Sequence, residues 1–366
     1  MKPFLVILIF LCSVPCSALR YDFQVGGVYY LIEDSIKAMT VLATSNLKSL
    51  KDLGPYKGEV IIPSSVEWGD KKYRVIGLLA TFRNCPDLVS VKLPYGIKYI
   101  DTFSFSNSGL RSIKIPHSVI RIGDRAFNNT RLTFVSIPSS VKEMQWGAFS
   151  GCDELTTISL PKDLSILGGG AFAVCTKLQE ITIPKNITKI ENQLFINCTS
   201  LKQVKLPPRI ISIDEQAFEG CYELSSIKIP KSVSEIGEAA FADCYNLKSI
   251  TIPEGVTCIS YLTFSNCHNL ASVSLPKTLT LIGESAFEGC YNLNSIEIPV
   301  GVTRILKNAF KDAPLTRVKV GWTSPKDFNH EVFSNPENIE LYVPGGCEEL
   351  YRKADYWKRF KKIISY

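Results

Sequence analysis

The sequence predicts a repeat solenoid: about a dozen repeats of ~23 residues whose short strands lie side by side in a parallel β-sheet. The first observation is a column of prolines at intervals of 23 residues: Pro138, Pro161, Pro184, Pro207, Pro230, Pro253, Pro276 and Pro299. The second is that a leucine column (Leu132 to Leu293) and a phenylalanine column (Phe149 to Phe310) keep the same interval. The third is that apolar and polar residues alternate just before each proline, which is typical of a short strand with one buried face.

Residues 1–18 have the composition of a secretory signal. A basic residue precedes the apolar run "FLVILIFLC", Pro15 follows it, and the small residue Ala18 offers a cleavage site. The run is too short to span a bilayer comfortably, so we expect export of a cleaved chain. Lipid attachment at Cys16 is the alternative that this segment leaves open.

Residues 19–58 are expected to form an N-terminal β cap. They contain "YYLIED" and "AMTVLAT", two apolar-rich stretches that read as strands. An open solenoid end exposes unpaired backbone groups, and a cap prevents the aggregation that such an edge invites.

Residues 59–321 form the predicted solenoid itself. In "LKSITIP" the apolar Leu247, Ile250 and Ile252 point inward, and Pro253 ends the strand because it has no N–H to donate. One such unit cannot bury its apolar side alone, so each repeat must be covered by its neighbours. The phenylalanines of successive repeats should therefore stack into a continuous spine.

The unit written as LxxIxIPxxVxxIGxxAFxxC resembles the leucine-rich repeat of the BspA-like (Treponema pallidum-type) family. The resemblance covers roughly residues 59–321 and implies a leucine-rich repeat fold. It also implies a secreted or surface location, and an adhesive role for some members. The chain departs from the pattern where the insertion "EWGDKKYRV" precedes Phe82, where two early repeats run 22 residues, and where Gly321 replaces the proline.

Residues 322–366 are expected to hold an irregular repeat and a C-terminal helical cap. In "CEELYRKADYWKRF" (347–360) the apolar residues Leu350, Ala354, Trp357 and Phe360 lie at helical intervals. We expect one helix over this stretch to seal the last rung.

The cysteines indicate packing and not a disulfide framework. Seven of them keep the 23-residue interval: Cys152, Cys175, Cys198, Cys221, Cys244, Cys267 and Cys290. Asn107, Asn129 and Ala313 are assigned to the same slot in other repeats, which a required bridge partner would not allow. We expect buried free thiols that pack as small hydrophobes. Cys258 lies outside this column, in a slot that other repeats fill with polar residues such as Glu143 and Glu235, and is expected to be exposed and reactive.

No catalytic or metal-binding motif emerges. The three histidines share no motif with a nucleophile, and no CxxC pair or phosphate-binding loop stands in a fitting context. We expect no enzyme activity and no cofactor. The net charge of +6 is spread over scattered lysines, so the composition does not indicate a nucleic-acid-binding protein. No segment after the signal is long enough to span a membrane.

The residues that the core does not dictate are the candidate binding surface. On the strand face, hydroxyl side chains alternate with cations, among them Lys205, Lys228, Arg317 and Lys319. This face is either a solvated sheet or a mildly basic floor for an acidic protein or a glycan. Phe134 interrupts it, either because the nearby repeats are irregular or because it is an exposed interface anchor.

A second candidate surface follows the cysteine column. Tyr222, Tyr245, His268 and Tyr291 occupy one slot in four consecutive repeats, so their rings should form a row with steps of ~5 Å. The row either stiffens the loops or docks a sugar or protein segment through flat ring faces.

Taken together, the sequence predicts an exported, non-enzymatic protein that binds an extracellular protein or glycan, with adhesion as one use. The alternative is a structural or spacer protein of the cell envelope. The ligand and the oligomeric state are not encoded in the repeat pattern.

Overall fold

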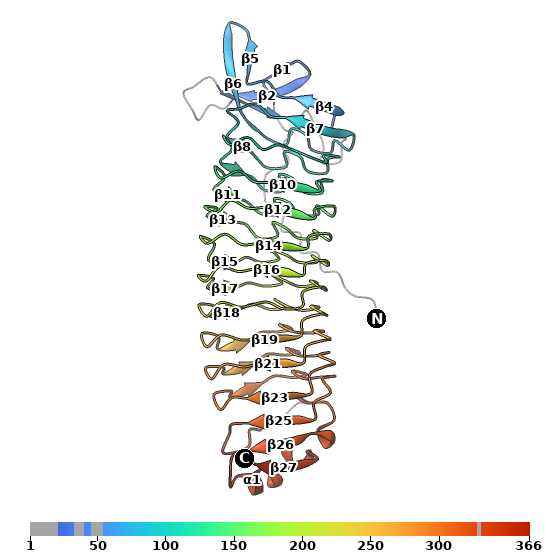
Figure 1. Cartoon of the computed structure of the whole chain (residues 1–366), viewed down its shortest axis with the longest axis vertical. Coiled ribbons are helices and arrows are strands. Elements are labelled where there is room, and N and C mark those ends of the chain that lie inside the picture. Colours follow the sequence, from blue (N-terminus) through green and yellow to red (C-terminus); the bar gives the residue numbers. More distant parts are fainter. Residues whose placement is uncertain (1–20, 33–39, 45–53, 328–330) are drawn as a thin grey trace.

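The computed structural model describes residues 21–32, 40–44, 54–327 and 331–366. It confirms the repeat solenoid: Figure 1 shows rungs stacked along one long axis, with the chain advancing one rung per repeat. Twelve phenylalanines stack through the core with ring centroids 4.9–6.2 Å apart, from Phe82 to Phe333, and mark the successive turns. The predicted spine is therefore present, and the signal segment lies outside the described residues.

The N-terminal end is a small β cap, as expected. Strands β1 (Phe23–Val25), β2 (Val28–Ile32) and β3 (Thr40–Thr44) pair antiparallel in order, and β3 then pairs in parallel with β6 (Lys71–Leu78). The two stretches predicted as strands correspond to β2 and β3. The insertion that departs from the repeat pattern is a hairpin of β5 (Ser65–Trp68) and β6.

Between residues 58 and 298 the strands of the first ladder end one or two residues before a proline, where the sequence predicts them, and three further strands follow in the C-terminal part of the chain. They are β4 (Gly58–Ile61), β7 (Leu88–Lys92), β10 (Phe134–Ser136), β12 (Thr157–Ser159), β14 (Glu180–Thr182), β16 (Gln203–Lys205), β19 (Ser249–Thr251), β21 (Ser272–Ser274), β23 (Ser295–Ile298), β25 (Arg317–Val320), β26 (Glu340–Val343) and β27 (Lys362–Ser365). The regular rungs pair in parallel with a shift of one repeat, so Ile250 lies opposite Val273. Apolar side chains thus lie above one another in every rung.

A second ladder of two-residue strands, which the pattern did not reveal, lies after the proline turn. It consists of β8 (Tyr99–Ile100), β9 (Arg121–Ile122), β11 (Glu143–Met144), β13 (Ile166–Leu167), β15 (Lys189–Ile190), β17 (Ser212–Ile213), β18 (Glu235–Ile236), β20 (Cys258–Ile259), β22 (Leu281–Ile282) and β24 (Arg304–Ile305). Two residues are too few for an alternation to show in the sequence. The solenoid therefore has two ladders of parallel strands, whereas we expected a single sheet.

Two positions in each regular repeat adopt the left-handed backbone conformation. They lie two residues before and two residues after the stacked phenylalanine, with φ between 49° and 72°. Glycine and asparagine hold many of these positions, because they enter this region at the lowest steric cost. Val174 holds one of them at φ 60°. The segment between the second ladder and the next leucine, which we call the arch, is folded by these two turns.

The C-terminal cap differs from the single helix predicted over 347–360. The structure has a short helix α1 (Glu348–Lys353), a 3₁₀ turn η2 (Trp357–Arg359), and then β27, which adds a last rung beside β26. The helix ends at Ala354, whose backbone is extended, and Leu350 is 51% exposed. Helical spacing misled here because Trp357 and Phe360 are buried from the 3₁₀ turn η2, which is separate from the helix.

The cysteine column is confirmed as free and buried thiols. Each thiol also donates a hydrogen bond to a phenylalanine carbonyl in the preceding rung, as from Cys198 Sγ to Phe172 O at 3.0 Å. The assignment of Asn107 and Asn129 to this slot is wrong, because both are left-handed residues one position earlier. The buried Ser108 and Thr130 hold the slot instead, displaced in the sequence by the 22-residue repeats.

Candidate binding surfaces

Phe134 is exposed on the strand face. It begins β10 opposite Thr157 of β12, and 56% of its surface is open to solvent. The same outward column holds Ser90 and Ser112, which form a bridge to each other in the two preceding rungs. A large apolar ring therefore stands out from a row of hydroxyl side chains on a rigid sheet.

The cations of the strand face divide into two groups. Lys205 and Lys228 are exposed on consecutive rungs, and in the described part of the chain neither forms an ion pair. Lys92 and Lys114 are also exposed, closer to Phe134 along the same column. These lysines remain available to a partner.

Arg317 and Lys319 lie near the C-terminal cap and have partners inside the protein. The Arg317 guanidinium lies 4.2 Å from the centre of the Tyr342 ring. The Lys319 ammonium lies 3.0 Å from the Glu297 carboxylate and 4.2 Å from the centre of the Tyr366 ring. The structure therefore does not bring these two cations together with Lys205 and Lys228 in one free surface.

The aromatic row that the sequence predicts is present. Ring centroids are 4.6 Å apart for Tyr222 and Tyr245, 4.5 Å for Tyr245 and His268, and 4.9 Å for His268 and Tyr291. The first two pairs are parallel stacks, whereas Tyr291 is tilted by 32° and 54% exposed. Because neighbouring rings cover one another, the inner rings offer only their edges and polar groups to solvent. A flat face for a sugar is open only at the ends of the row.

A row of asparagines accompanies the aromatic row. Asn269 donates from Nδ2 to Oδ1 of Asn246 at 3.0 Å, and Asn292 donates in the same way to Asn269 at 3.1 Å. These asparagines were not among the predicted site residues, although "YNL", "HNL" and "YNL" repeat at this slot. Burial and the nearby Asp243 carboxylate raise the pKa of the Tyr245 phenol above its ordinary value.

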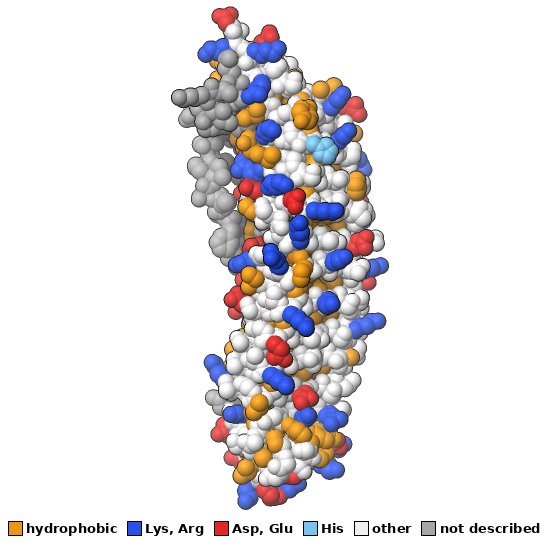
Figure 2. Space-filling view, turned by 60° about the vertical axis from the view of Figure 1, so that its left-hand side comes forward, with side chains coloured by type: hydrophobic (Ala, Val, Ile, Leu, Met, Phe, Trp, Pro, Cys, Tyr) orange, Lys and Arg blue, Asp and Glu red, His pale blue; other side chains and the backbone are white. Residues whose placement is uncertain are grey.

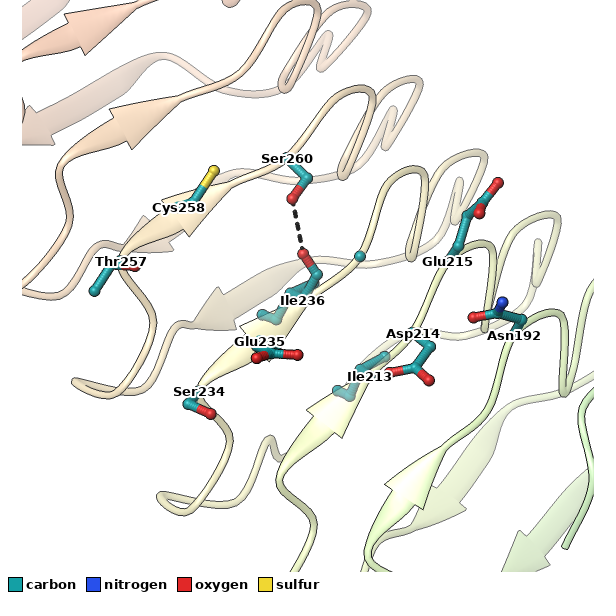
Figure 3. Close-up of a pocket in the computed structure, with 11 residues that line it drawn as sticks. Asn192, Ile213, Asp214, Glu215, Ser234, Glu235, Ile236, Thr257, Cys258 and Ser260 are labelled. Atoms are coloured by element: carbon teal, nitrogen blue, oxygen red, sulfur yellow. Dashed lines mark hydrogen bonds between the residues drawn. The ribbon is translucent and has the colours of Figure 1, made fainter.

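A hollow lies on the second ladder, across β17, β18 and β20 (Figure 3). Its volume is about 390 Å³, and its walls include Asp214, Glu235 and Cys258. Ser260 donates a hydrogen bond from Oγ to the carbonyl oxygen of Ile236 at 3.0 Å beside it.

Cys258 is half-buried, which corrects the expectation that it is exposed. Burial raises the pKa of its thiol above the ordinary value, and a hydrogen bond with Ser260 opposes that rise only in part. Since the thiolate is the reactive form, Cys258 is a weaker nucleophile than an ordinary surface cysteine. It is still the most accessible thiol of the described residues.

Among the residues that the structure describes, no group of three or more histidine, cysteine or acidic side chains is arranged to hold a metal ion. In the same part of the chain, no helix combines the length and apolar character needed to cross a membrane.

These rungs and surfaces define a leucine-rich repeat solenoid. The family model for the BspA type leucine rich repeat region matches residues 79–202, 165–283 and 211–340, and the chain belongs to this family. No curated protein sequence matches the chain.

Solved structures agree on the fold. A leucine-rich repeat protein from Bacteroides ovatus is 26% identical, with a TM-score of 0.61 over 94% of this chain and 100% of that one. The pneumococcal vaccine antigen PcpA is 18% identical, with a TM-score of 0.60 over 94% of this chain and 98% of that one, and this likeness concerns the fold alone.

Proposed function

We propose that the protein is an exported, non-enzymatic binding protein whose strand face recognises an extracellular protein or glycan, with adhesion as one use. Phe134 is the observation that carries the proposal. A Phe side chain that is buried in a complex contributes about 1.5–3 kcal/mol. Aromatic side chains are enriched among the residues that dominate protein interfaces, so an exposed ring that stands out from a row of hydroxyl side chains on a sheet is a suitable anchor for a partner.

The surroundings of Phe134 support an anionic or polar partner. Serine and threonine hydroxyls line the outward columns beside it, and Lys92 and Lys114 stand on the two rungs before it. An apolar anchor surrounded by groups that can donate hydrogen bonds is a common interface design. Lys205 and Lys228 extend the positive charge several rungs further.

The aromatic row has a narrower role in this proposal. Because the inner rings are stacked on both faces, the row stiffens the arch, and face-to-face docking is confined to Tyr222 and Tyr291 at its two ends. Arg317 and Lys319 are left out of the proposed contact surface, because intramolecular partners already hold them.

Export rests on residues 1–18, which lie outside the described residues. In the proposed state the signal is cleaved and the mature chain carries no anchor. A lipid anchor at Cys16 is the alternative. A structural or spacer role in the envelope is the second candidate function. It is favoured by the unbroken phenylalanine spine, which makes the solenoid a stiff rod of twelve stacked turns.

The test is a screen of the purified mature chain against extracellular matrix proteins and glycan arrays, followed by variants. Phe134→Ser should weaken binding to any hit at least tenfold without changing the melting temperature. Tyr261→Ser is the matched control, because Tyr261 is also an exposed ring (46%) but lies on the arch. Saturable binding that is indifferent to Phe134→Ser contradicts the proposal, and self-association without any ligand favours the spacer role.

A further inference from the structure

Four exposed cations follow one another along the proline turns. They belong to four consecutive rungs, and each directly follows the ladder proline, except Arg209, which stands one residue further on: Lys162, Lys185, Arg209 and Lys231. All four are exposed, and none of them forms an ion pair with the described residues. We call this row the basic edge.

Neighbouring cations of the basic edge are one rung apart along the solenoid axis. The second strands of these repeats pair in parallel without a register shift, so that Lys189 lies opposite Ser212 and Ser212 opposite Glu235. In the same four rungs the stacked phenylalanines are 5.7, 5.4 and 5.2 Å apart. One cation therefore recurs at each short step along the solenoid axis.

Charges of opposite sign are segregated to different parts of the rung from residue 191 onward, a range that includes Arg209 and Lys231, whereas in the two rungs before it Asp163 lies beside Lys162 and Glu180 lies on a first strand. From residue 191 to 292 every Lys and Arg lies on or beside the first strands or in the proline turns: Lys202, Lys205, Arg209, Lys228, Lys231, Lys248 and Lys277. Ten of the eleven acidic residues lie on the second ladder or the arch: Glu191, Asp214, Glu215, Glu219, Glu223, Glu235, Glu238, Asp243, Glu284 and Glu288. The exception is Glu254, in a proline turn. Figure 2 shows Lys and Arg side chains following the long axis of the face that it displays, with fewer Asp and Glu between them.

This arrangement attracts an extended anion to one edge and repels it from the other. A second copy of the chain could set its acidic arch against the basic edge, but each exposed ion pair between folded proteins contributes little to the free energy of association. A linear polyanion gains more, because each phosphate or carboxylate that meets a cation releases a condensed counterion. The single line of cations, one per rung, fits a chain with one charge per unit better than a surface.

We propose that the basic edge binds a linear acidic glycan that carries one carboxylate per sugar, laid parallel to the solenoid axis across the rungs of Lys162 to Lys231. One pyranose unit is comparable in length to one rung, so successive carboxylates meet successive cations. This surface is separate from the strand face around Phe134 and goes beyond the function proposed above.

The experiment measures binding of oligogalacturonate, a linear glycan with one carboxylate per sugar, to the mature chain by calorimetry at several salt concentrations. The edge variant is Lys162→Gln, Lys185→Gln, Arg209→Gln and Lys231→Gln combined. The control variant removes the same charge from exposed cations near the two caps: Lys71→Gln, Arg74→Gln, Lys353→Gln and Lys361→Gln. Both variants should melt at the wild-type temperature, because all eight side chains are exposed.

We expect the wild-type affinity to fall with salt with a log–log slope on the order of 3, since four contacts each release somewhat less than one counterion. The edge variant should lose at least tenfold in affinity, whereas the control variant should stay within about twofold. Oligomers of two sugars should bind much more weakly than those of six, and neutral dextran should not bind.

Three results overturn the proposal: no binding by the wild type, equal losses in both variants, or equally tight binding of duplex DNA with the same salt slope. Self-association that the edge variant abolishes also overturns it, because a second copy then covers the edge. Phe134→Ser is measured in parallel and should leave oligogalacturonate binding unchanged. A failure of the strand-face function is thus distinguishable from a failure of this proposal.

Discussion

The thiol of Cys198 donates a hydrogen bond to the carbonyl oxygen of Phe172 in the preceding rung, with Sγ and O 3.0 Å apart. The contact recurs through the cysteine column at 3.0–3.3 Å, up to Cys290 and Phe264. Cysteine suits this slot because it is small, largely apolar and still able to donate weakly. The cysteine column thus links neighbouring rungs through hydrogen bonds to the backbone, in addition to packing in the core.

Replacement of Cys198 tests this role. Cys198→Ala removes both the donor and the volume of the sulfur, and it should lower the free energy of unfolding by about 1–2 kcal/mol. Cys198→Ser keeps a donor and should cost less, because Ser108 and Thr130 are accommodated in the same slot. Urea denaturation measures both. A serine variant less stable than the alanine variant would show that the thiol acts only as an apolar filler.

Stability should fall at alkaline pH because of the same column. Burial raises the pKa of the Cys198 and Cys290 thiols to about 12 and that of Cys152 to about 11. In the unfolded chain the thiols ionise near pH 8.5, so from that pH upward the unfolded state loses protons that the folded state keeps. Each thiol then costs about 1.4 kcal/mol of stability per pH unit until its folded pKa is reached. The contribution of the buried thiols to the free energy of unfolding is fully present below pH 8.5 and is lost as the pH rises through 11–12.

The measurement is the urea midpoint at pH 7, 9 and 10, below the range where most tyrosines ionise. Cys198→Ser removes one titrating thiol and should make the decline with pH shallower than in the wild type. A midpoint that stays constant from pH 7 to 10 would mean that the thiols are accessible to solvent in the folded chain.

Val174 is predicted to be a local weak point. It holds a left-handed position at φ 60°, where a β-branched side chain costs about 1–2 kcal/mol, and it is 41% exposed, so little packing is lost with its side chain. Val174→Gly should therefore raise the free energy of unfolding by about 1 kcal/mol. Val300→Gly is the control, because Val300 is more exposed still but has an ordinary φ. Stabilisation by both variants, or by neither, would contradict the backbone explanation.

The sequence was sufficient for the parts of the fold that repetition determines. Phe149 and Phe172 share a slot, so stacking was the one way for each repeat to bury its ring, and the structure has that stack. The second ladder could not be predicted because a strand of two residues shows no alternation of apolar and polar residues. The left-handed positions could not be predicted because residues as different as Arg125, Val174 and Asn266 occupy them.

Features that occur once were harder to predict than features that repeat. Leu350 fitted a helical pattern, yet it is exposed, because β27 and the separate turn at Trp357 close the last rung instead of one long helix. The exposure of Phe134 could be predicted from its outward slot in the repeat. The intramolecular partners of Arg317 and Lys319 could not be predicted, since Tyr342 and Tyr366 come from irregular rungs whose register the repeat does not fix.

The aromatic row gives a prediction that separates stiffening from docking. Tyr245 has a ring against each of its faces, at 4.6 and 4.5 Å, whereas Tyr291 has a stacking partner on one side only. Aromatic pairs contribute ~0.5–1.5 kcal/mol each, so Tyr245→Ser should cost about twice the free energy of unfolding that Tyr291→Ser costs. Tyr291→Ser, which removes the open ring face, should instead have the larger effect on any ligand that docks at this row. Thermal melts and binding measured on both variants decide the matter. If neither quantity changes in either variant, the stack at Tyr245 does not stiffen the arch and the open ring face of Tyr291 does not dock a partner.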